Sequence, residues 1–338
     1  MKLVSFEKEE GKVRAGLLID NSIYDLHKCG KVCKIDVPKH LLELLNKEDG
    51  LQRAHSIEQH IKSGIDCKRI EADSVRLLSP IPRPPSCRDA YAFRQHVETA
   101  RKNRGAEMIP EFDQFPVFYF TNHNAIVGEG DVILEKDHFE RLDFELECAI
   151  VIGKGGKNIS AAKADEHIAG FTIMNDLSAR QLQMEEMKLS LGPAKGKDFA
   201  TVLGPWLVTP DELEQYKIDT PSGATYDLVM TAQHNGREIS RGNLKDMNWT
   251  FAQIIERASY GVELFAGDVI GSGTVGTGCY LELNGTKARE AEAAGQSYTS
   301  VWLQDGDEIS LSITGLGTLT NRVRKGPGDY SILELKHK

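Results

Sequence analysis

The 338-residue sequence contains few cysteines for its length and no long hydrophobic run. No stretch approaches the roughly 20 consecutive apolar residues that a membrane-spanning helix needs. The charged residues Lys2, Glu7 and Lys8 come too early for a secretory signal. The six cysteines are scattered, and no second Cys/His pair follows Cys29 and Cys33 to complete a zinc site. We therefore expect a cytoplasmic protein with reduced thiols.

Basic residues are fewer than acidic ones, with 41 Lys and Arg against 50 Asp and Glu, which gives a formal net charge of −9. This balance argues against a nucleic-acid or membrane-surface binder, because neither polyanion would be attracted. It does not exclude a small anionic substrate, since a local basic pocket with a metal can bind a carboxylate. The 40% apolar and 27% charged residues are typical of a packed globular protein.

Prolines concentrate in the segment Pro80–Pro85, which we interpret as a domain boundary. Proline fixes φ and interrupts both helices and central strands. Residues 1–79 are expected to form a small α+β domain, and residues 80–338 a larger catalytic domain. The elements expected in the small domain are strands at Leu3–Phe6 and Val13–Ile19 and helices at 38–47 and 50–64.

Strand-like runs dominate after residue 80, and few long helical patterns separate them. This favours a mainly β or α+β fold over a doubly wound α/β sheet. The expected helices are residues 96–104, 176–188 and 250–258. The expected strands are Val117–Phe120, Phe144–Val151, Ile168–Ile173, Leu203–Val208, Leu228–Gln233, Val269–Ile270, Tyr280–Leu283 and Ile309–Ile313.

Two glutamates alternate with apolar residues in the segment 142–152. Side chains alternate across a strand, so Glu145 and Glu147 are expected on the same face. Adjacent carboxylates repel each other unless they are solvated, protonated or bridged by a cation. An isolated pair more commonly forms the solvated face of an amphipathic strand. Here the apolar continuation Ala149–Ile152 indicates burial, which favours a cation bridge.

A third acid, Asp176, is expected to begin a helix. Arg180 and Gln183 follow at i+4 and i+7, so the three side chains would share one helix face. The pattern is compatible with a plain N-cap and a surface salt bridge. It is equally compatible with a metal ligand followed by two substrate contacts.

Two further residues come from less specific patterns. His96 precedes the basic segment Arg101–Gly105, which fits a lid that closes on an anion. A single histidine is more commonly a surface or core residue than a catalyst. Lys197, in the turn-like segment Gly196–Phe199, is compatible with a solvated lysine.

The combination of these motifs, in this order, is more specific than any one of them. The succession is Asp89-x-Tyr91-x-x-Arg94-Gln95-His96, Glu145-x-Glu147, Asn175-Asp176-x-Ser178-Ala179-Arg180, Gly192-Pro193-x-x-Gly196-Lys197-x-Phe199, Gly271-Ser272-Gly273-Thr274 and Leu281-Glu282-Leu283. From about residue 80 to the C-terminus it resembles the fumarylacetoacetate hydrolase family. The resemblance implies a mixed β-sandwich roll with short helices, a metal at one open end, and a homodimer.

The resemblance also implies roles for individual residues. Asp89, Glu145, Glu147 and Asp176 would ligate one divalent cation, and oxygen ligands suit Mg²⁺, Mn²⁺ or Ca²⁺ rather than zinc. We expect Mg²⁺. His96 would be the general base, and Glu282 the acid that orients it. The residues expected to line the substrate pocket are Tyr91, Tyr119, Arg180, Gln183, Lys197 and Thr274, with Arg104 matching after a shift of one residue.

The sequence departs from the fumarylacetoacetases of this family in two respects. Met187 stands where they have a substrate-binding tyrosine, and the N-terminal domain of about 80 residues is shorter. These departures leave the substrate open.

The resulting hypothesis is a metal-dependent hydrolase that cleaves a C–C bond in a small anionic 1,3-dicarbonyl oxo-acid. His96, held by Glu282, would take a proton from water, and Lys197 would stabilise the departing carbanion as an enolate. The alternatives are a decarboxylase or a hydratase/isomerase of 2-oxo acids that uses the same metal site. A metal-binding protein without catalytic turnover is a further alternative.

Overall fold

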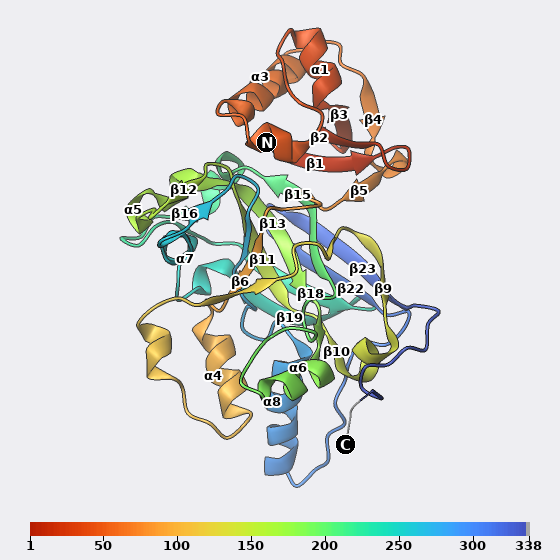
Figure 1. Ribbon diagram of the computed structural model, residues 1–338, viewed down its shortest axis with the longest axis vertical. Coiled ribbons are helices and arrows are strands. Elements are labelled where there is room, and N and C mark those ends of the chain that lie inside the picture. The colour runs from red at the N-terminus through yellow and green to blue at the C-terminus, as the bar shows by residue number, and fades with distance from the viewer. Residues whose placement is uncertain (336–338) are drawn as a thin grey trace.

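The computed structural model describes residues 1–335 and forms a mixed β-sandwich with short helices, as expected from the sequence (Figure 1). Within these residues, a 12-stranded sheet packs against a 5-stranded sheet. Figure 1 shows the N-terminal unit at one end of the sandwich and helices α4, α6 and α8 at the other. No helix in residues 1–335 combines the length and apolar character needed to cross a membrane.

The large sheet contains the strands that carry the candidate site. Its main path runs β4-β3-β2-β1-β15-β13-β11-β21-β6-β7, while β5 pairs with β1 and β8 with β15. The strands are β1 (Lys2–Glu7), β2 (Val13–Ile19), β3 (Ser22–Asp25), β4 (Arg69–Glu71), β5 (Arg76–Leu78), β6 (Cys87–Ala90), β7 (Phe118–Thr121), β8 (Ile126–Val127), β11 (Leu146–Ile152), β13 (Ile168–Asp176), β15 (Thr201–Val208) and β21 (Val269–Gly271).

The 5-stranded sheet covers one face of the large sheet and has the order β19-β18-β22-β23-β9. In β22 the apolar residues Ile309, Leu311 and Ile313 are buried, while Ser310 and Ser312 alternate with them. This period of two turns one face of the strand toward the core. The strands are β9 (Gly130–Leu134), β18 (Val229–His234), β19 (Arg237–Asn243), β22 (Glu308–Ile313) and β23 (Gly317–Lys325).

Short helices and two-stranded pairs surround the sandwich. The helices are α1 (Leu26–Cys33), α2 (Leu41–Leu45), α3 (Gly50–Lys62), α4 (Arg94–Lys102), α5 (Ala161–Ala164), α6 (Arg180–Met187), α7 (Phe251–Ser259) and α8 (Tyr280–Ala293). The pairs are β10 (Leu142–Asp143) with β14 (Ser178–Ala179), β12 (Gly156–Lys157) with β20 (Glu263–Leu264), and β16 (Lys217–Ile218) with β17 (Thr225–Tyr226).

Two local predictions are wrong. The segment Tyr280–Leu283 is the first turn of α8 and not a strand, because a short apolar run has no periodicity that separates the two. Asp176 does not begin a helix: it ends β13, where it pairs with Thr201, and Ala179 is the N-cap of α6. Asp176 and Arg180 therefore do not share a helix face.

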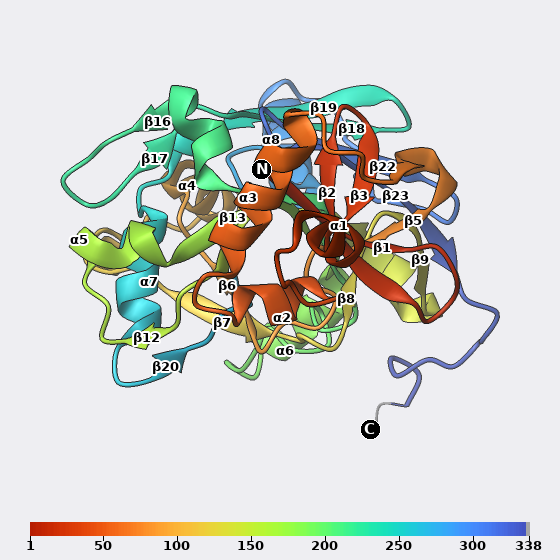
Figure 2. The same ribbon diagram turned by 90° about the horizontal axis from the view of Figure 1, so that it is seen from above.

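Residues 1–79 continue the large sheet. β1 pairs antiparallel with β15, with Leu3 opposite Leu207, and both side chains are fully buried. One apolar cluster joins Leu3 and Leu17 of the N-terminal unit to Ala149 and Leu207 of the sandwich. Figure 2, viewed from above, shows α1 and α3 of this unit over the sandwich, between α5 and α7 on one side and β9 and β23 on the other. The domain boundary near residue 80 stays a prediction.

This packing predicts that the N-terminal unit and the sandwich unfold together. Replacing Leu3 with alanine should lower the free energy of unfolding by about 2–5 kcal/mol, because it removes buried apolar contacts and leaves a cavity. All three tryptophans, Trp206, Trp249 and Trp302, lie beyond residue 79. Urea unfolding followed by tryptophan fluorescence should therefore register the loss.

Leu189→Ala is the matched control, because Leu189 is 82% exposed. Its effect should stay within about 0.5 kcal/mol, as for an ordinary surface substitution. An unshifted tryptophan transition in the Leu3→Ala variant, with circular dichroism showing an earlier separate loss, would mean that the two parts unfold independently.

Candidate active site

Four acidic side chains converge at one end of the large sheet. Asp89 lies on β6, Glu147 on β11 and Asp176 at the end of β13, while Glu145 lies in the break between β10 and β11. Each offers a carboxylate oxygen, and these four oxygens all lie within 4.8 Å of one another. All four residues are buried. The structure therefore brings together the four residues that the sequence analysis predicted as metal ligands.

A glycine on the intervening strand leaves the space for this cluster. β21 lies between β11 and β6, and its Gly271 pairs with Ala149 on one side and Asp89 on the other. A Cβ atom at Gly271 would lie 2.5 Å from Asp89 Oδ1 and 3.0 Å from Glu147 Oε2. A side chain at this position would require the ends of Asp89, Met174 and Glu147 to shift from their present places.

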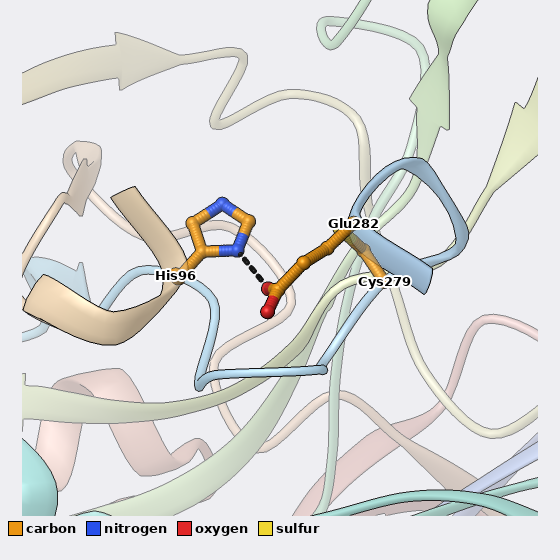
Figure 3. A group of neighbouring side chains, drawn as sticks. All are labelled: His96, Cys279 and Glu282. Carbon is orange, nitrogen blue, oxygen red and sulfur yellow. Dashed lines mark hydrogen bonds and ion pairs between the residues drawn. The ribbon is translucent and has the colours of Figure 1, made fainter. Parts of the chain in front are cut away.

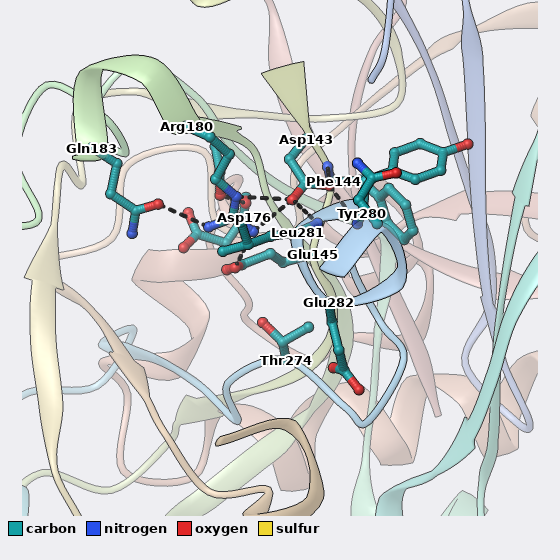
Figure 4. Close-up of polar contacts among 12 residues, drawn as sticks. Asp143, Phe144, Glu145, Asp176, Arg180, Gln183, Thr274, Tyr280, Leu281 and Glu282 are labelled. Carbon is teal, nitrogen blue, oxygen red and sulfur yellow. Dashed lines mark hydrogen bonds and ion pairs between the residues drawn. The ribbon is translucent and has the colours of Figure 1, made fainter. Parts of the chain in front are cut away.

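Two buried cations, Lys197 and Arg180, contact the acidic cluster, and Figure 4 shows Arg180 beside Glu145 and Gln183. Lys197 Nζ donates a hydrogen bond of 2.7 Å to Asp176 Oδ2 and a second one to Glu145 Oε2. Arg180 Nη2 donates to Glu145 Oε1 at 2.7 Å, and Arg180 Nη1 donates to Gln183 Oε1 at 2.9 Å. Lys197 is therefore not the solvated turn residue that its sequence context allowed.

These contacts separate the pKa values of the carboxylates. Burial raises the pKa of Glu145, but Lys197 and Arg180 outweigh it and lower that pKa to about 2. Burial and the Asp176 carboxylate raise the pKa of Asp89 to about 7. Burial and the neighbouring Asp89 raise the pKa of Glu147 well above its ordinary value. Glu145 is thus ionised at neutral pH, whereas Asp89 is about half protonated and Glu147 favours its protonated form without further positive charge.

The donor set fits a hard divalent cation. Among the described residues, no hydrogen-bond donor reaches Glu147 Oε2 or Asp176 Oδ1, although both atoms are buried. Unpaired buried carboxylate oxygens are costly, and a cation would satisfy them. Oxygen ligands of this kind suit Mg²⁺, Mn²⁺ or Ca²⁺. Asp89, Glu145, Glu147 and Asp176 could hold such an ion.

A histidine–glutamate pair lies on the helices next to the acidic cluster (Figure 3). His96 of α4 and Glu282 of α8 are both buried, and His96 Nδ1 lies 2.7 Å from Glu282 Oε2. Because a carboxylate accepts, Nδ1 carries the proton and Nε2 is left as the basic nitrogen. The other oxygen of Glu282 accepts from the Thr277 N–H at 2.9 Å, which fixes the carboxylate.

Cys279 completes a His/Cys/Glu group with this pair. Burial, reinforced by Asp143, raises the pKa of the Cys279 thiol well above its ordinary value. A protonated thiol is a poor metal ligand, since the thiolate is the binding form. We therefore interpret His96 and Glu282 as a hydrogen-bonded pair with a thiol beside it.

A pocket of about 300 Å³ adjoins both groups. Every residue that the sequence analysis assigned to the site lines this pocket, except Glu147, Asp176 and Glu282. These three are buried, in contact with lining residues: Glu147 with Thr274, Asp176 with Tyr119 and Lys197, and Glu282 with His96. The lining residues predicted from the sequence are Asp89, Tyr91, His96, Arg104, Tyr119, Glu145, Arg180, Gln183, Lys197 and Thr274.

The sequence analysis did not assign the apolar part of the wall, which contains Ala100, Val117, Met184, Pro193 and Leu281. Met187, noted as a departure, also lines it. The two methionines could have been predicted from helical spacing. Met184 and Met187 follow Arg180 at i+4 and i+7, which places them on the same face of α6 as this pocket residue.

The sequence model described as "Fumarylacetoacetate (FAA) hydrolase C-terminal" matches residues 86–324, which include the whole site. The chain belongs to the fumarylacetoacetate hydrolase family. Its relatives differ in how much of this chain they cover and in the reaction that their names describe.

A fumarylacetoacetase of Arabidopsis thaliana is 31% identical over 295 residues, covering 71% of this chain and 69% of the relative. An oxaloacetate tautomerase of Bacillus subtilis is 29% identical over 323 residues, covering 91% of this chain and 95% of the relative. Among solved structures, a fumarylacetoacetate hydrolase of Exiguobacterium antarcticum superimposes with a TM-score of 0.67 at 28% identity, covering 96% of this chain and all of the other.

The pKa pattern predicts that a cation binds in competition with protons. Raised carboxyl pKa values stabilise the cation-free fold at low pH, and this contribution is lost as the pH rises through about 7 for Asp89. A cation displaces these protons, so its affinity should rise by about tenfold per pH unit for each proton released. Mg²⁺ or Mn²⁺ should therefore raise the melting temperature more at pH 8 than at pH 5.5.

Glycine variants provide the control for this thermal shift. Gly271→Ala should abolish the shift, because its Cβ collides with Asp89 and Glu147. Gly328→Ala should keep it, because a Cβ there meets only the Glu135 carboxylate at 3.6 Å. Equal cation-induced shifts at both pH values, or in both variants, would contradict the assignment of the cation site.

Proposed function

We propose that the protein is a divalent-cation-dependent hydrolase that cleaves a C–C bond in a small 1,3-dicarbonyl oxo-acid, of the acylpyruvate or fumarylacetoacetate type. The observation that carries the proposal is the buried His96–Glu282 pair, which lies at the same pocket as the carboxylate cluster. A base oriented by a carboxylate is what activation of a water molecule requires. Family membership supports a reaction on an oxo-acid, since both fumarylacetoacetase and oxaloacetate tautomerase are relatives.

The chain's own residues supply the proton transfer. His96 Nε2 takes a proton from a water molecule, and Glu282 stabilises the imidazolium that forms. The resulting hydroxide attacks the carbonyl carbon, and collapse of the adduct breaks the C–C bond. The proton held at Nε2 then returns to the departing carbon, so that the two products together contain one added water.

Positive charge near the substrate stabilises the departing carbanion as its enolate. Burial lowers the pKa of Lys197, but Asp176 and Glu145 outweigh it, so this pKa lies above its ordinary value and the ammonium stays charged. Arg180 and Gln183 hold a carboxylate or carbonyl oxygen of the substrate. Arg104, which follows α4 and lines the pocket, binds another anionic oxygen of the substrate. A divalent cation at the four carboxylates would supply Lewis-acid polarisation of the substrate oxygens.

The apolar wall favours a substrate with one apolar arm. Met184, Met187, Pro193, Val117 and Leu281 all line the pocket. Flexible methionine side chains adapt to apolar groups of different shape. An acylpyruvate places its oxo-acid end toward the charged residues and its acyl chain toward this wall.

A tautomerase or isomerase is the second candidate, and a decarboxylase would use the same charged residues. The match to the oxaloacetate tautomerase of Bacillus subtilis covers 91% of this chain and so extends into the N-terminal unit, whereas the match to the Arabidopsis fumarylacetoacetase covers 71%. Enolate formation alone would serve either reaction, with Lys197 and Arg180 as the stabilising charges. The homodimer expected from the family resemblance is part of this proposal as well.

The products distinguish these reactions. Loss of enol absorbance should be followed for acylpyruvates of increasing chain length, fumarylacetoacetate and oxaloacetate, with Mg²⁺ or Mn²⁺ and with EDTA. We expect cation-dependent products that carry one added water by mass, with the highest kcat/KM for apolar acylpyruvates.

Release of carbon dioxide would instead identify a decarboxylase, and interconversion at constant mass a tautomerase or isomerase. No turnover of any of these compounds, together with cation-dependent thermal stabilisation, would favour a binding protein without catalysis.

Replacing His96 tests the proposed base. His96→Ala should lower kcat for hydrolysis by about 10²–10⁴-fold, the usual contribution of a positioned base, while the cation-induced thermal shift stays as in the wild type. His167→Ala is the matched control, because His167 is also buried but contacts the Lys154 carbonyl, away from the pocket. Full activity in the His96→Ala variant would rule out His96 as the base.

A further inference from the structure

Asp143 is a fully buried carboxylate that the proposed reaction does not use. It ends β10, two residues before Glu145, and accepts hydrogen bonds from two separate parts of the site. Its Oδ1 accepts from the N–H groups of Phe144 at 2.9 Å and Tyr280 at 2.7 Å. Its Oδ2 accepts from the Leu281 N–H at 2.9 Å and from Arg180 Nε at 2.8 Å. Figure 4 shows Asp143 between Arg180 and the start of α8.

On one side, Asp143 caps the helix that carries Glu282. The first N–H groups of a helix have no partner within the helix and require a cap. The N-cap residue of α8, Cys279, makes no side-chain capping hydrogen bond. Asp143 accepts from the first two N–H groups of α8, those of Tyr280 and Leu281. Glu282 is the next residue, so the position of its carboxylate against His96 depends on this anchored turn.

On the other side, Asp143 fixes the guanidinium of Arg180. The planar group contacts three residues: Nε and Nη2 contact Asp143, Nη2 also contacts Glu145, and Nη1 contacts Gln183. A guanidinium held at several nitrogens has one orientation. Removing the Asp143 contact would leave the guanidinium held only by Glu145 and Gln183, with its Nε no longer fixed.

We propose that Asp143 is a positioning residue, which holds the His96–Glu282 pair and Arg180 in a fixed spatial relation for the reaction. The proposal rests on the proposed function for the roles of His96 and Arg180. Asp143 itself touches neither substrate nor cation in this scheme. It links the proton-transfer group to the anion-binding group through two oxygens of one rigid carboxylate.

The conservative variant Asp143→Asn tests this link. An amide has the size of the carboxylate, but in either orientation its NH₂ group faces two N–H donors: those of Leu281 and Arg180, or those of Phe144 and Tyr280. In both cases one N–H at the start of α8 loses its acceptor, so this turn must move. Small displacements of catalytic groups can cost about 10²-fold in rate. We expect kcat to fall and KM to rise in the same variant, by about 10²-fold in kcat/KM together.

Double-mutant cycles separate positioning from general destabilisation. Glu282→Gln should mainly lower kcat, and Arg180→Lys should mainly raise KM. If Asp143 acts through these residues, combining Asp143→Asn with either one should cost less than the product of the two separate losses. Losses that multiply in both cycles would overturn the proposal.

A spectroscopic readout keeps the test independent of turnover. The His96 Nδ1–H resonance, assigned by its absence in His96→Ala, and the Arg180 Nε–H resonance should both shift in Asp143→Asn. If the wild type hydrolyses none of the oxo-acids, the proposed function fails, and these two resonances still decide the role of Asp143. Resonances that stay in place in the Asp143→Asn variant would overturn the positioning role.

Asp25→Asn is the matched control. Asp25 is also buried, also caps a helix by accepting from the Lys28 N–H at 3.0 Å, and also pairs with a cation, Lys28, at 3.6 Å. It lies in the N-terminal unit, away from the pocket. Asp25→Asn should lower the melting temperature without changing kcat, KM or the two resonances. Rate losses in Asp25→Asn equal to those in Asp143→Asn would show that loss of a cap alone explains the effect.

Discussion

The four buried carboxylates of the site repel one another, and the structure requires nearby positive charges to offset this repulsion. Two unit charges 4 Å apart in a partly screened protein environment repel each other by about 4 kcal/mol. That is comparable to the whole stability of many folded domains, about 5–15 kcal/mol. Lys197 and Arg180 offset part of this repulsion, and both concentrate on Glu145. Burial is the largest cause of the raised pKa values of Asp89, Glu147 and Asp176, and the repulsion that remains raises them further.

The fold brings these charges together by joining strands that are distant in the sequence. β13, β11, β21 and β6 are neighbours in the sheet, although β6 and β21 are about 180 residues apart in the chain. Glycine at position 271 allows side chains from β11 and β6 to meet across the strand between them. The histidine–glutamate pair comes from another layer, since α4 and α8 lie beyond the ends of these strands (Figure 1). The carboxylates of the site thus come from the large sheet, and its histidine–glutamate pair comes from two separate helices.

Sequence patterns predicted much of this site because its residues occur in short motifs with fixed spacing. Strand alternation indicated that Glu145 and Glu147 share a face, and the family resemblance implied one site for His96, Lys197 and Glu282. His96 and Lys197 line the pocket, and Glu282 contacts His96 from behind it. The same alternation places Asp143, two residues before Glu145, on the face that carries the two glutamates. No local pattern indicates that Asp143 caps α8, because that helix begins more than 130 residues later in the chain. Contacts of that kind depend on tertiary packing.

The two wrong predictions of secondary structure have related physical causes. The run Tyr280–Leu283 is too short to distinguish a strand from a buried helical turn, and a distant carboxylate, absent from any local pattern, caps it. Asp176 resembled an N-cap because aspartate at the start of an apolar run commonly is one, yet β13 continues through it by pairing with β15. In both cases long-range pairing outweighed local preference.

The junction between β1 and β15 has a consequence for how copies of the protein meet in solution. A sheet that ended at β15 would present unpaired backbone groups beside the buried apolar residues Leu203 and Leu207, a template for strand addition by another chain. β8 and β1 occupy this edge, and the sheet then continues outward to β4. β4 is three residues long and carries the exposed ion pair Arg69–Glu71. A short, charged strand is a poor partner for aggregation, so the N-terminal unit protects the edge of the sheet that carries the acidic cluster.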